Sequence, residues 1–413
     1  MTREIIVLGA GMVGVSIAWH LARRGHSVVL VDRRDPGRET SFGNAGIIQR
    51  EAVRPYPFPR DLATLLRVLP NQAVDIRYRV GGVIQATRSL LGYWHNSSSR
   101  RYARIVPEYA SLIMQSLDTH GQMIEAAGAQ SLVRKEGWLE LYRGEEGFAR
   151  RKREAEENAE RFGVSHRLLD ASALHEAEPH LTGDLAGAIH WQDPWTVDDP
   201  GALVQAYAAA FESEGGELMH AEIRDLARSK EGWRVTTDQG TMEAPDLVMA
   251  LGPWSGDWLA RQGISMPLFV MRGYHMHYGS TDAARLGHWV MDAEVGYLLA
   301  PMRAGIRLTT GAELAPREAS ARHGQLEAAE KVARQLFPLG ERLDPEPWKG
   351  ARPCTPDMKP VIGPAPGLPG LWCAFGHGHQ GFTVGPATGK LLAEMIEGEP
   401  TAIDMHPFRA DRF

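Results

Sequence analysis

Cysteine is nearly absent from this chain, which has only Cys354 and Cys373 among its 413 residues. Two cysteines are too few for a disulfide framework or for a zinc site with standard ligand spacing. Both are therefore expected to be small, buried apolar side chains in a reducing compartment. Long apolar runs are also absent, because "APDLVMALGPW" is shorter than the roughly 18 residues of a membrane-spanning helix.

The sequence has no excess of positive charge either. Its net charge of -6 and its pI near 6.3 give no reason to expect a nucleic-acid partner. No basic leader with an apolar stretch precedes the first expected strand, which favours a cytoplasmic protein. With 43% hydrophobic and 23% charged residues, the composition is that of a globular protein, and the length suits two domains.

The N-terminal stretch "IIVLGAGMVGVSIAWHLARRGHSVVLVD" predicts a strand, a glycine turn, a helix and a second strand. The turn has GxGxxG spacing, and an aspartate closes the second strand about 20 residues later, where a carboxylate can bind ribose hydroxyls. The helix N-terminus offers free N–H groups to a pyrophosphate. This pattern predicts NAD(P) or FAD, bound by Gly9, Ala10, Gly11, Met12, Val13, Gly14, Asp32, Arg33 and Arg34.

The segment after Asp32 favours FAD over a nicotinamide. It reads "RRDPGRETSFGNAGIIQR", a loop of small residues, whereas a nicotinamide enzyme is expected to continue with regular alternation of strands and helices. Farther on, Trp233 to Thr236 and Gly240 to Glu243 predict a hairpin around "DQG". The run "DLVMALG" then predicts a buried strand that ends in glycine.

Six motifs in a fixed order identify a family resemblance. They are "GAGMVG", "TSFGNAG", "ALGPWS", "MRGY", "GARPCTPDMKPVIG" and "GHGHQG", and they extend over nearly the whole chain. The sequence resembles the D-amino acid oxidase superfamily of flavoenzymes, and most of all its D-amino acid dehydrogenase small-subunit branch. Each motif alone is weak evidence, but the ordered set is highly specific.

The resemblance implies a non-covalently bound FAD, because relatives that attach flavin through cysteine place that residue earlier than Cys354. It also implies that the "GHGHQG" loop passes beside the isoalloxazine and that a helix at about Pro386 to Ile396 points its N-terminus at the pyrimidine edge. The further residues implied at the cofactor are Ser41, Asn44, Ala45, Gly46, Ile47, Ile223, Ala250, Gly252, Trp254, Gly376, Gly378, His379, Gln380, Gly381, Phe382 and Thr383.

A metal site is the alternative interpretation of the glycine–histidine loop. His377 and His379 alternate, so they would share one face of an extended strand. No third or fourth ligand stands at a usable spacing, which favours the flavin interpretation.

The implied fold class is α/β, with a Rossmann-type FAD domain and a second, α+β substrate domain on a mostly antiparallel sheet. The chain is expected to pass between them, with residues 1–55, 196–260 and 348–413 in the FAD domain and residues 56–195 and 261–347 in the substrate domain. Five segments have strand character and are expected to form the sheet over the flavin: "GWLELY", "GAIHW", "MPLFVMRGYHMHY", "GYLLAPM" and "GIRLTTG". The charged segment "GEEGFARRKREAEENAERFG" predicts a solvated surface helix.

An α-amino acid substrate needs a cation for its carboxylate. By resemblance, Arg352 is the candidate, since a guanidinium can donate two parallel hydrogen bonds; an internal salt bridge is the alternative. Tyr297 matches a clamp position, with a core tyrosine as the alternative, and Tyr274 is a further pocket candidate. His379 stands where glycine oxidase-like relatives carry a second arginine.

The leading functional hypothesis is oxidative deamination of D-amino acids, in which hydride passes from Cα to flavin N5 and water converts the imine to the 2-oxo acid and ammonia. An oxygen-using amine oxidase of the glycine, sarcosine, D-proline or D-hydroxyproline type is the alternative. An NAD(P)-dependent dehydrogenase and a non-catalytic flavoprotein are alternatives of other classes.

Residues 62–104 suggest how the electrons leave. This segment combines leucines, Tyr93 and Trp94 with several arginines, a composition typical of segments that lie on an anionic membrane surface. It predicts peripheral contact with the cytoplasmic face of the inner membrane and a quinone acceptor. A pair of substrate-domain helices with exposed arginines is the alternative.

Overall fold

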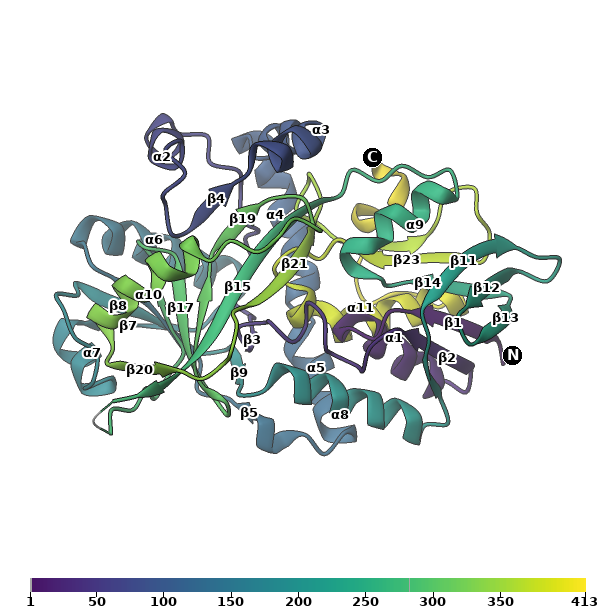
Figure 1. Ribbon diagram of the computed structural model, residues 1–413, viewed down its shortest axis with the longest axis horizontal. Coiled ribbons are helices and arrows are strands. Elements are labelled where there is room, and N and C mark those ends of the chain that lie inside the picture. The colour runs from purple at the N-terminus through teal and green to yellow at the C-terminus, as the bar shows by residue number, and fades with distance from the viewer. Residues whose placement is uncertain (1, 282) are drawn as a thin grey trace.

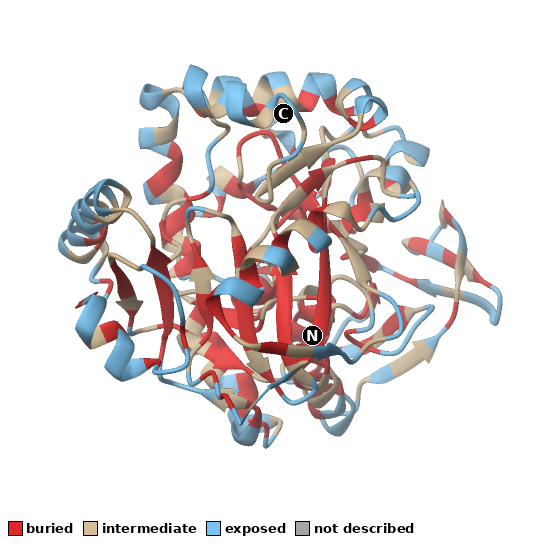
Figure 2. Ribbon diagram, turned by 60° about the vertical axis from the view of Figure 1, so that its left-hand side comes forward, coloured by how far each residue is buried: buried red, intermediate tan, exposed pale blue. Residues whose placement is uncertain are grey.

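The protein was analysed as a computed structural model that describes residues 2–281 and 283–413. Two large sheets lie at opposite ends of the molecule, and both termini are on the side of the smaller one (Figure 1). The central strands of both sheets are buried, whereas the outer helices carry most of the exposed residues (Figure 2).

The smaller sheet is the expected nucleotide-binding type. Among the described residues it has six strands in the order β10-β2-β1-β14-β23-β22, all parallel except the pair β22 and β23. The central strands β1 and β14 are apolar on both faces because other elements cover both faces. The strands are β1 (Glu4–Leu8), β2 (Ser27–Asp32), β10 (Glu217–His220), β14 (Asp246–Met249), β22 (Val361–Pro364) and β23 (Leu371–Phe375).

Helices cover one face of this sheet and a small sheet covers the other. The first face packs on α1 (Met12–Ala22), α8 (Pro200–Ser213) and α11 (Gly381–Glu397). The second face packs on a three-stranded sheet and α9 (Ser255–Arg261). The strands of that sheet are β11 (Ile223–Arg228), β12 (Trp233–Thr237) and β13 (Gly240–Ala244), which confirms the expected hairpin.

Glycines let α1 and α11 touch at their backbones. A Cβ added at Gly385 would lie 2.6 Å from Cγ of Met12, and one added at Gly389 would lie 2.6 Å from the main chain of Ser16. Larger residues would push the helices apart. The N-termini of α1 and α11 consequently lie on the same side of the sheet and border the cavity described below.

The larger sheet is mostly antiparallel. Within residues 2–281 and 283–413 it has eleven strands, ordered β4-β19-β15-β18-β17-β16-β6-β8-β7, with β20 and β21 paired to β15. All five segments expected to form this sheet do so. Its strands are β4 (Ile76–Tyr78), β6 (Trp138–Tyr142), β7 (His166–Asp170), β8 (Gly187–Trp191), β15 (Phe269–Ser280), β16 (Val290–Asp292), β17 (Tyr297–Met302), β18 (Gly305–Thr310), β19 (Ala312–Leu314), β20 (Leu339–Arg342) and β21 (Trp348–Cys354).

The domain boundaries remain a prediction. Strand β21 falls in the range assigned to the FAD domain, but it pairs with β15 of the larger sheet from Phe269 to His275. The smaller elements between the two sheets are β3 (Ile47–Ile48), β5 (Val133–Arg134), β9 (Trp195–Val197) and α5 (Ser116–Ala126).

Several helices surround the larger sheet. The charged helix α6 (Glu145–Phe162) lies on the surface as expected, with only Ala155 and Asn158 buried. Helix α10 (Gly324–Leu336) packs its apolar side on one face of the sheet. The remaining helices are α2 (Leu62–Val68), α3 (Val80–Asn96), α4 (Ser99–Ile113) and α7 (Ala171–Ala177). In the part of the chain that the structure describes, no helix has both the length and the apolar character needed to cross a bilayer.

Candidate active site

The site begins at the glycine turn between β1 and α1. Gly9 has a φ of +104°, and a Cβ there would lie 2.5 Å from the carbonyl oxygen of Ala250. A Cβ at Gly14 would lie 1.7 Å from the carbonyl oxygen of Gly9. At Gly11, by contrast, the nearest atom is Oγ of Ser41 at 3.4 Å. Gly9 and Gly14 are thus needed by the fold itself, whereas Gly11 leaves open space at the start of α1.

Asp32 supports this turn from the end of β2. Its carboxylate accepts hydrogen bonds from the backbone N–H groups of Ala10, at 2.7 Å, and Arg34, at 3.0 Å. Burial raises the pKa of Asp32, although these two hydrogen bonds oppose the shift. A carboxylate has about four acceptor positions, so Asp32 can still accept ribose hydroxyls.

Two arginines flank Trp254, which lines the same end of the cavity. Arg33 lies over one face of Trp254, with its guanidinium carbon 5.0 Å from the ring centroid, and it also pairs with Glu39. Arg317, from the loop after β19, lies 5.2 Å from the same ring and pairs with Asp257. Trp254 is thereby held in place by cation–π contacts.

The loop at residues 40–46 lies between α1 and the larger sheet. Oγ of Ser41 accepts a hydrogen bond from the backbone N–H of Met12, at 3.0 Å, so it caps α1. Asn44 closes the turn by accepting from the N–H of Gly46 at 2.8 Å. Arg307 of β18 donates to the carbonyl oxygens of Phe42 and Asn44 at 3.0 and 2.6 Å. The sequence analysis missed Arg307, because nothing in its local sequence indicates a partner more than 260 residues away.

The glycine–histidine loop separates its two histidines. Nε2 of His377 lies 3.0 Å from Oγ1 of Thr388 in α11, and burial lowers the pKa of His377 to about 3. The ring of His379 instead lies edge-on to Tyr56, with centroids 5.3 Å apart. Gly376 and Gly378 have φ values of +80° and +56°, which explains why glycine alternates with histidine here. The two imidazoles have different partners, which favours the flavin interpretation over a shared metal.

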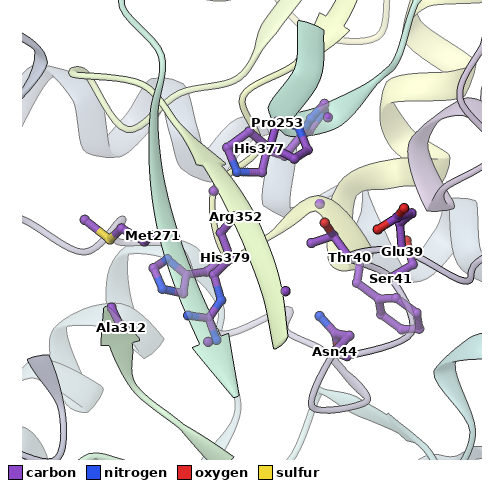
Figure 3. A pocket seen from close by; sticks show the side chains of 18 of the residues that line it. Glu39, Thr40, Ser41, Asn44, Pro253, Met271, Ala312, Arg352, His377 and His379 are labelled. Carbon is purple, nitrogen blue, oxygen red and sulfur yellow. The ribbon is translucent and has the colours of Figure 1, made fainter. Parts of the chain in front are cut away.

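Arg352 extends from β21 into the cavity, close to His379, Met271 and Ala312 (Figure 3). Its Nη1 donates to the carbonyl oxygen of Gly311 at 3.0 Å, and no carboxylate among the described residues lies within 4.0 Å of the guanidinium. Gly273 makes room for it, since a Cβ there would lie 2.6 Å from Nη2. The internal salt bridge considered as the alternative is therefore not what this arginine makes.

The charge of Arg352 acts on the neighbouring imidazole of His379. Burial, and secondarily the positive charge of Arg352, lowers the pKa of His379 to about 3. Burial also lowers the pKa of Arg352, yet a guanidinium remains protonated in proteins. The cavity thus presents a fixed cation beside a neutral imidazole.

The two candidate tyrosines are not brought together with Arg352. In the strand register Arg352 pairs with Met271, so their side chains lie on the cavity face, and the alternating residues Tyr274 and Tyr297 belong to the opposite face. Both tyrosines border the cavity, but their rings are in the core beneath α10. The hydroxyl of Tyr274 donates to Glu313 at 2.6 Å.

Tyr297 is likewise directed into the protein. Burial and the neighbouring Asp292 raise the pKa of Tyr297. The sequence resemblance located its strand, but the face on which its side chain lies depends on a pairing that a single sequence does not specify.

A buried polar chain that the sequence analysis missed lies at the N-terminus of α11. Nε2 of Gln380 donates to Oε1 of Gln49 at 2.7 Å, and Nε2 of Gln49 donates to Oε1 of Glu51 at 3.0 Å. Nε1 of Trp138 also donates to this oxygen, whereas Oε2 of Glu51 has no partner. Burial raises the pKa of Glu51 to about 7. Gln49 and Gln380 are 331 residues apart, so no local motif joins them.

These elements enclose one elongated cavity of about 1390 Å³ that extends from the glycine turn to the larger sheet. Ala10, Gly14, Arg34, Gly46, Gly376, Gln380 and Thr383 were expected at the cofactor but do not line the cavity. The expected cofactor residues that do line it are Gly9, Gly11, Met12, Val13, Asp32, Arg33, Ser41, Asn44, Ala45, Ile47, Ile223, Ala250, Gly252, Trp254, Gly378, His379, Gly381 and Phe382.

The cavity fits FAD in shape and chemistry. Its narrow end offers the bare backbone at Gly11, the N-terminus of α1 and the carboxylate of Asp32, which suit a pyrophosphate and a ribose. The N-terminus of α11 opens on the wider part, where it can stabilise negative charge. These features suit a nucleotide at the glycine-turn end and leave the end with Arg352 for a substrate, which is the basis of the function proposed below.

Comparisons with known proteins identify the family of this chain. A family model described as FAD dependent oxidoreductase matches residues 4–395, and the chain belongs to this family of FAD-dependent flavoenzymes. A D-amino acid dehydrogenase of Rhizorhabdus wittichii is 31% identical over 99% of this chain and 100% of the relative. One of Cereibacter sphaeroides is 32% identical over 99% of this chain and 95% of the relative.

Solved structures show the same fold. Glycine oxidase from Geobacillus kaustophilus superposes with a TM-score of 0.74 at 24% identity, covering 100% of both chains. L-Proline dehydrogenase from P. horikoshii superposes with a TM-score of 0.73 at 21% identity, covering 100% of this chain and 98% of the other. The expected α/β fold class, with an FAD-binding part and a substrate part, is thereby confirmed.

Proposed function

We propose that this flavoenzyme oxidises the α-carbon of D-amino acids. The observation that carries the proposal is Arg352, whose guanidinium lines the cavity and, among the described residues, donates only to the carbonyl oxygen of Gly311. A half-buried cation that lines the cavity, with no carboxylate of the described residues beside it, is suited to a ligand carboxylate. The dehydrogenase names of the full-length relatives support the choice of a D-amino acid.

The chain's own residues orient the substrate and exclude water from the reacting carbon. Arg352 binds the carboxylate, and the neutral imidazole of His379 can accept a hydrogen bond from the substrate amine without competing for that carboxylate. When bound, FAD would supply the two-electron acceptor for the hydride of Cα, and water would hydrolyse the remaining substrate iminium to the 2-oxo acid and ammonia. No side-chain base is required if the amine binds in its neutral form.

Replacing Arg352 tests the proposal. Arg352→Met keeps much of the apolar stem but leaves the substrate carboxylate without a partner, which costs about 2 to 5 kcal/mol. We expect kcat/KM for a D-amino acid to fall by roughly thirtyfold to several thousandfold, with the FAD content unchanged. Arg352→Lys should recover only part of the activity, because an ammonium cannot reproduce the planar fork.

The matched control is the substrate itself. The same variants are assayed with the amide of the D-amino acid, which lacks the carboxylate charge, and its rate should fall much less. Equal losses on acid and amide would mean that Arg352 supports the fold or the cofactor instead, and the substrate end would have to be reassigned.

We further propose a quinone-type acceptor and peripheral contact with an anionic membrane through residues 62–104. Large apolar side chains on α2 and α3 are exposed, among them Leu62 and Ile84 at 70% each and Leu66 at 58%. Arginines of the same segment supply the complementary charge. In Figure 1 the two helices lie at one edge of the molecule.

Sedimentation with vesicles tests this contact. The FAD-loaded enzyme should sediment with phosphatidylglycerol vesicles, less with neutral phosphatidylcholine vesicles, and less again at high salt. Leu66→Asp should weaken the association. Failure to sediment, together with faster turnover by oxygen than by a quinone analogue, would refute the proposal.

A further inference from the structure

The substrate end of the cavity continues past Arg352 as an apolar strip across the larger sheet. The strand register pairs Arg352 of β21 with Met271 of β15, Met271 with Leu314 of β19, and Leu314 with Tyr78 of β4. Residues paired in this way point to the same face, and all four line the cavity. With strands about 4.8 Å apart, three spacings place Tyr78 roughly 14 Å from Arg352 along the sheet, with Met271 and Leu314 between them.

Apolar side chains enclose this strip from the other side. Phe58, Leu90 and Tyr93 form one hydrophobic cluster with Met271 and Leu314. Phe58, Leu90 and Tyr93 also line the cavity. The cavity is therefore apolar on two sides at the position where the side chain of a carboxylate-anchored substrate would extend.

Helix α2 covers the strip. Leu65, Val68 and Leu69 at this helix line the cavity, yet no residue of α2 is buried. The helix is attached mainly by polar contacts of its own segment, such as the bidentate pair of Arg67 with Asp75 at 2.8 and 2.6 Å. It acts as a thin cover whose inner side is apolar.

The polar groups of Tyr78, Tyr93 and Asp75, which border the strip, are already engaged. The hydroxyl of Tyr78 donates to the carbonyl oxygen of Leu69 at 2.6 Å, and that of Tyr93 donates to the carbonyl oxygen of Tyr56 at 2.6 Å. Asp75 is neutralised by Arg67. A charged or strongly polar substrate side chain would lose its water here without gaining a partner, which is unfavourable.

From these contacts we infer that the preferred substrates are D-amino acids with long aliphatic or aromatic side chains, and that Met271, Leu314 and Leu65 determine this specificity. This inference rests on the proposed function, since it places the substrate carboxylate on Arg352. Extension of an apolar side chain along the strip removes apolar area from water on both partners.

Steady-state assays of the FAD-loaded enzyme with a dye acceptor test the inference. The kcat/KM for D-phenylalanine and D-leucine should exceed that for D-alanine by about tenfold or more, and D-glutamate and D-lysine should be poorer still. If D-alanine, D-glutamate or D-lysine is the better substrate, the inference is overturned while the proposed function stands. If none of the D-amino acids reduces the enzyme under anaerobic conditions, the proposed function itself fails.

Two neighbouring leucines of α2 provide a matched pair of variants. Leu65 lines the cavity and Leu66 does not, although both are exposed to solvent. Leu65→Ala should lower the ratio of kcat/KM for D-phenylalanine over D-alanine about threefold, and Leu66→Ala should leave it unchanged. Met271→Ala should lower the same ratio about tenfold.

Binding of unreactive carboxylates gives a readout that is independent of turnover. Phenylacetate should perturb the visible absorption of the bound FAD at a Kd at least tenfold below that of acetate, and Met271→Ala should reduce this difference. Equal affinity for the two carboxylates would refute the apolar subsite. The apolar subsite would also be refuted if Leu65→Ala and Met271→Ala changed only the KM of a quinone analogue and not that of the amino acid. The strip would then belong to the electron acceptor.

Discussion

At the residue scale, the three glycines of the nucleotide turn have different physical roles. A side chain at Gly14 would overlap the carbonyl oxygen of Gly9, and Gly9 itself has a positive φ and contacts Ala250. Gly11 has an ordinary extended backbone, with φ of -76°, and space beside it. Within the GxGxxG spacing, the fold therefore requires Gly9 and Gly14, whereas a bound ligand requires Gly11.

Substitution by alanine should separate these roles. Gly14→Ala is expected to prevent normal folding, because no main-chain shift of a few tenths of an ångström relieves a 1.7 Å contact. Gly11→Ala should fold with nearly unchanged stability but bind FAD at least tenfold more weakly. Circular dichroism of the apoproteins and fluorescence titration with FAD measure the two effects. Normal FAD affinity in Gly11→Ala would show that the pyrophosphate lies elsewhere.

Glu51 makes stability depend on pH in a defined direction. Burial raises its pKa from 4.5 to about 7, so between these values the folded state holds a proton that the unfolded state releases. The free energy of unfolding therefore decreases as the pH rises through this window, by roughly 3 kcal/mol in total.

Glu51→Gln removes this titration. The variant should be more stable than the parent by roughly 3 kcal/mol at pH 8, with the gain vanishing near pH 4. Denaturant unfolding at several pH values measures it, and Glu156→Gln on the exposed side of α6 serves as the control without a pH-dependent gain. A gain that is the same at every pH would mean that Glu51 is ionised in the folded protein.

At the element scale, helix α11 shows where the sequence could and could not predict the fold. The family resemblance implies a helix that begins at about Pro386, which is compatible with the preference of proline for the first turn. In the structure α11 begins at Gly381, so Pro386 is inside the helix and has no N–H for the carbonyl oxygen of Phe382. Nε2 of His120 in α5 lies 2.9 Å from that oxygen and donates to it instead. A partner from another helix thus permits a helix start that local rules do not predict.

His120 and Pro386 should be energetically coupled. Burial lowers the pKa of His120 to about 4, so the neutral ring donates from Nε2 and can accept at Nδ1 from the hydroxyl of Tyr207, 2.9 Å away. His120→Leu leaves the Phe382 carbonyl without a donor and should cost about 1 to 3 kcal/mol. In the Pro386→Ala background, where the helix supplies its own N–H, the same substitution should cost about 1 kcal/mol less.

Thermal or denaturant unfolding of the parent, the two single variants and the double variant measures this coupling. Additive effects of the two substitutions would mean that His120 stabilises the protein by packing alone. Thr119→Ala, on the same helix, provides a comparison, because its hydroxyl donates within α5 to the carbonyl oxygen of Gln115.

At the scale of the whole molecule, what could be predicted from the sequence depended on the range of the interactions. The glycine turn, the hairpin and the strands of the larger sheet follow from local patterns, and the structure confirms them. The face on which Tyr274 and Tyr297 lie, and the contact of Arg307 with the loop at 40–46, depend on pairings between distant segments. The candidate site is made almost entirely of such pairings, so its residues were easier to name than to orient.

Because both sheets contribute to the wall of the cavity, FAD bound there should stabilise the whole protein against unfolding. The wall contains the turn at Gly11 and the loops at 40–46 and 376–383 from one side, and Met271 and Arg352 of the larger sheet from the other. At a free FAD concentration one hundred times Kd, binding to the folded state alone adds about 2.7 kcal/mol to the free energy of unfolding. We expect the apoprotein to melt several degrees lower and FAD to restore the melting temperature in a concentration-dependent way.

Hydrogen exchange should localise this stabilisation. FAD should slow amide exchange in the loops at 40–46 and 376–383, which both contact the larger sheet, and leave the exposed helix α6 unchanged. Gly11→Ala should shift the FAD concentration needed for protection without changing which amides are protected. Protection confined to the glycine turn would show that the cofactor contacts the nucleotide end only, and the assignment of the wider end to the flavin and substrate would then be wrong.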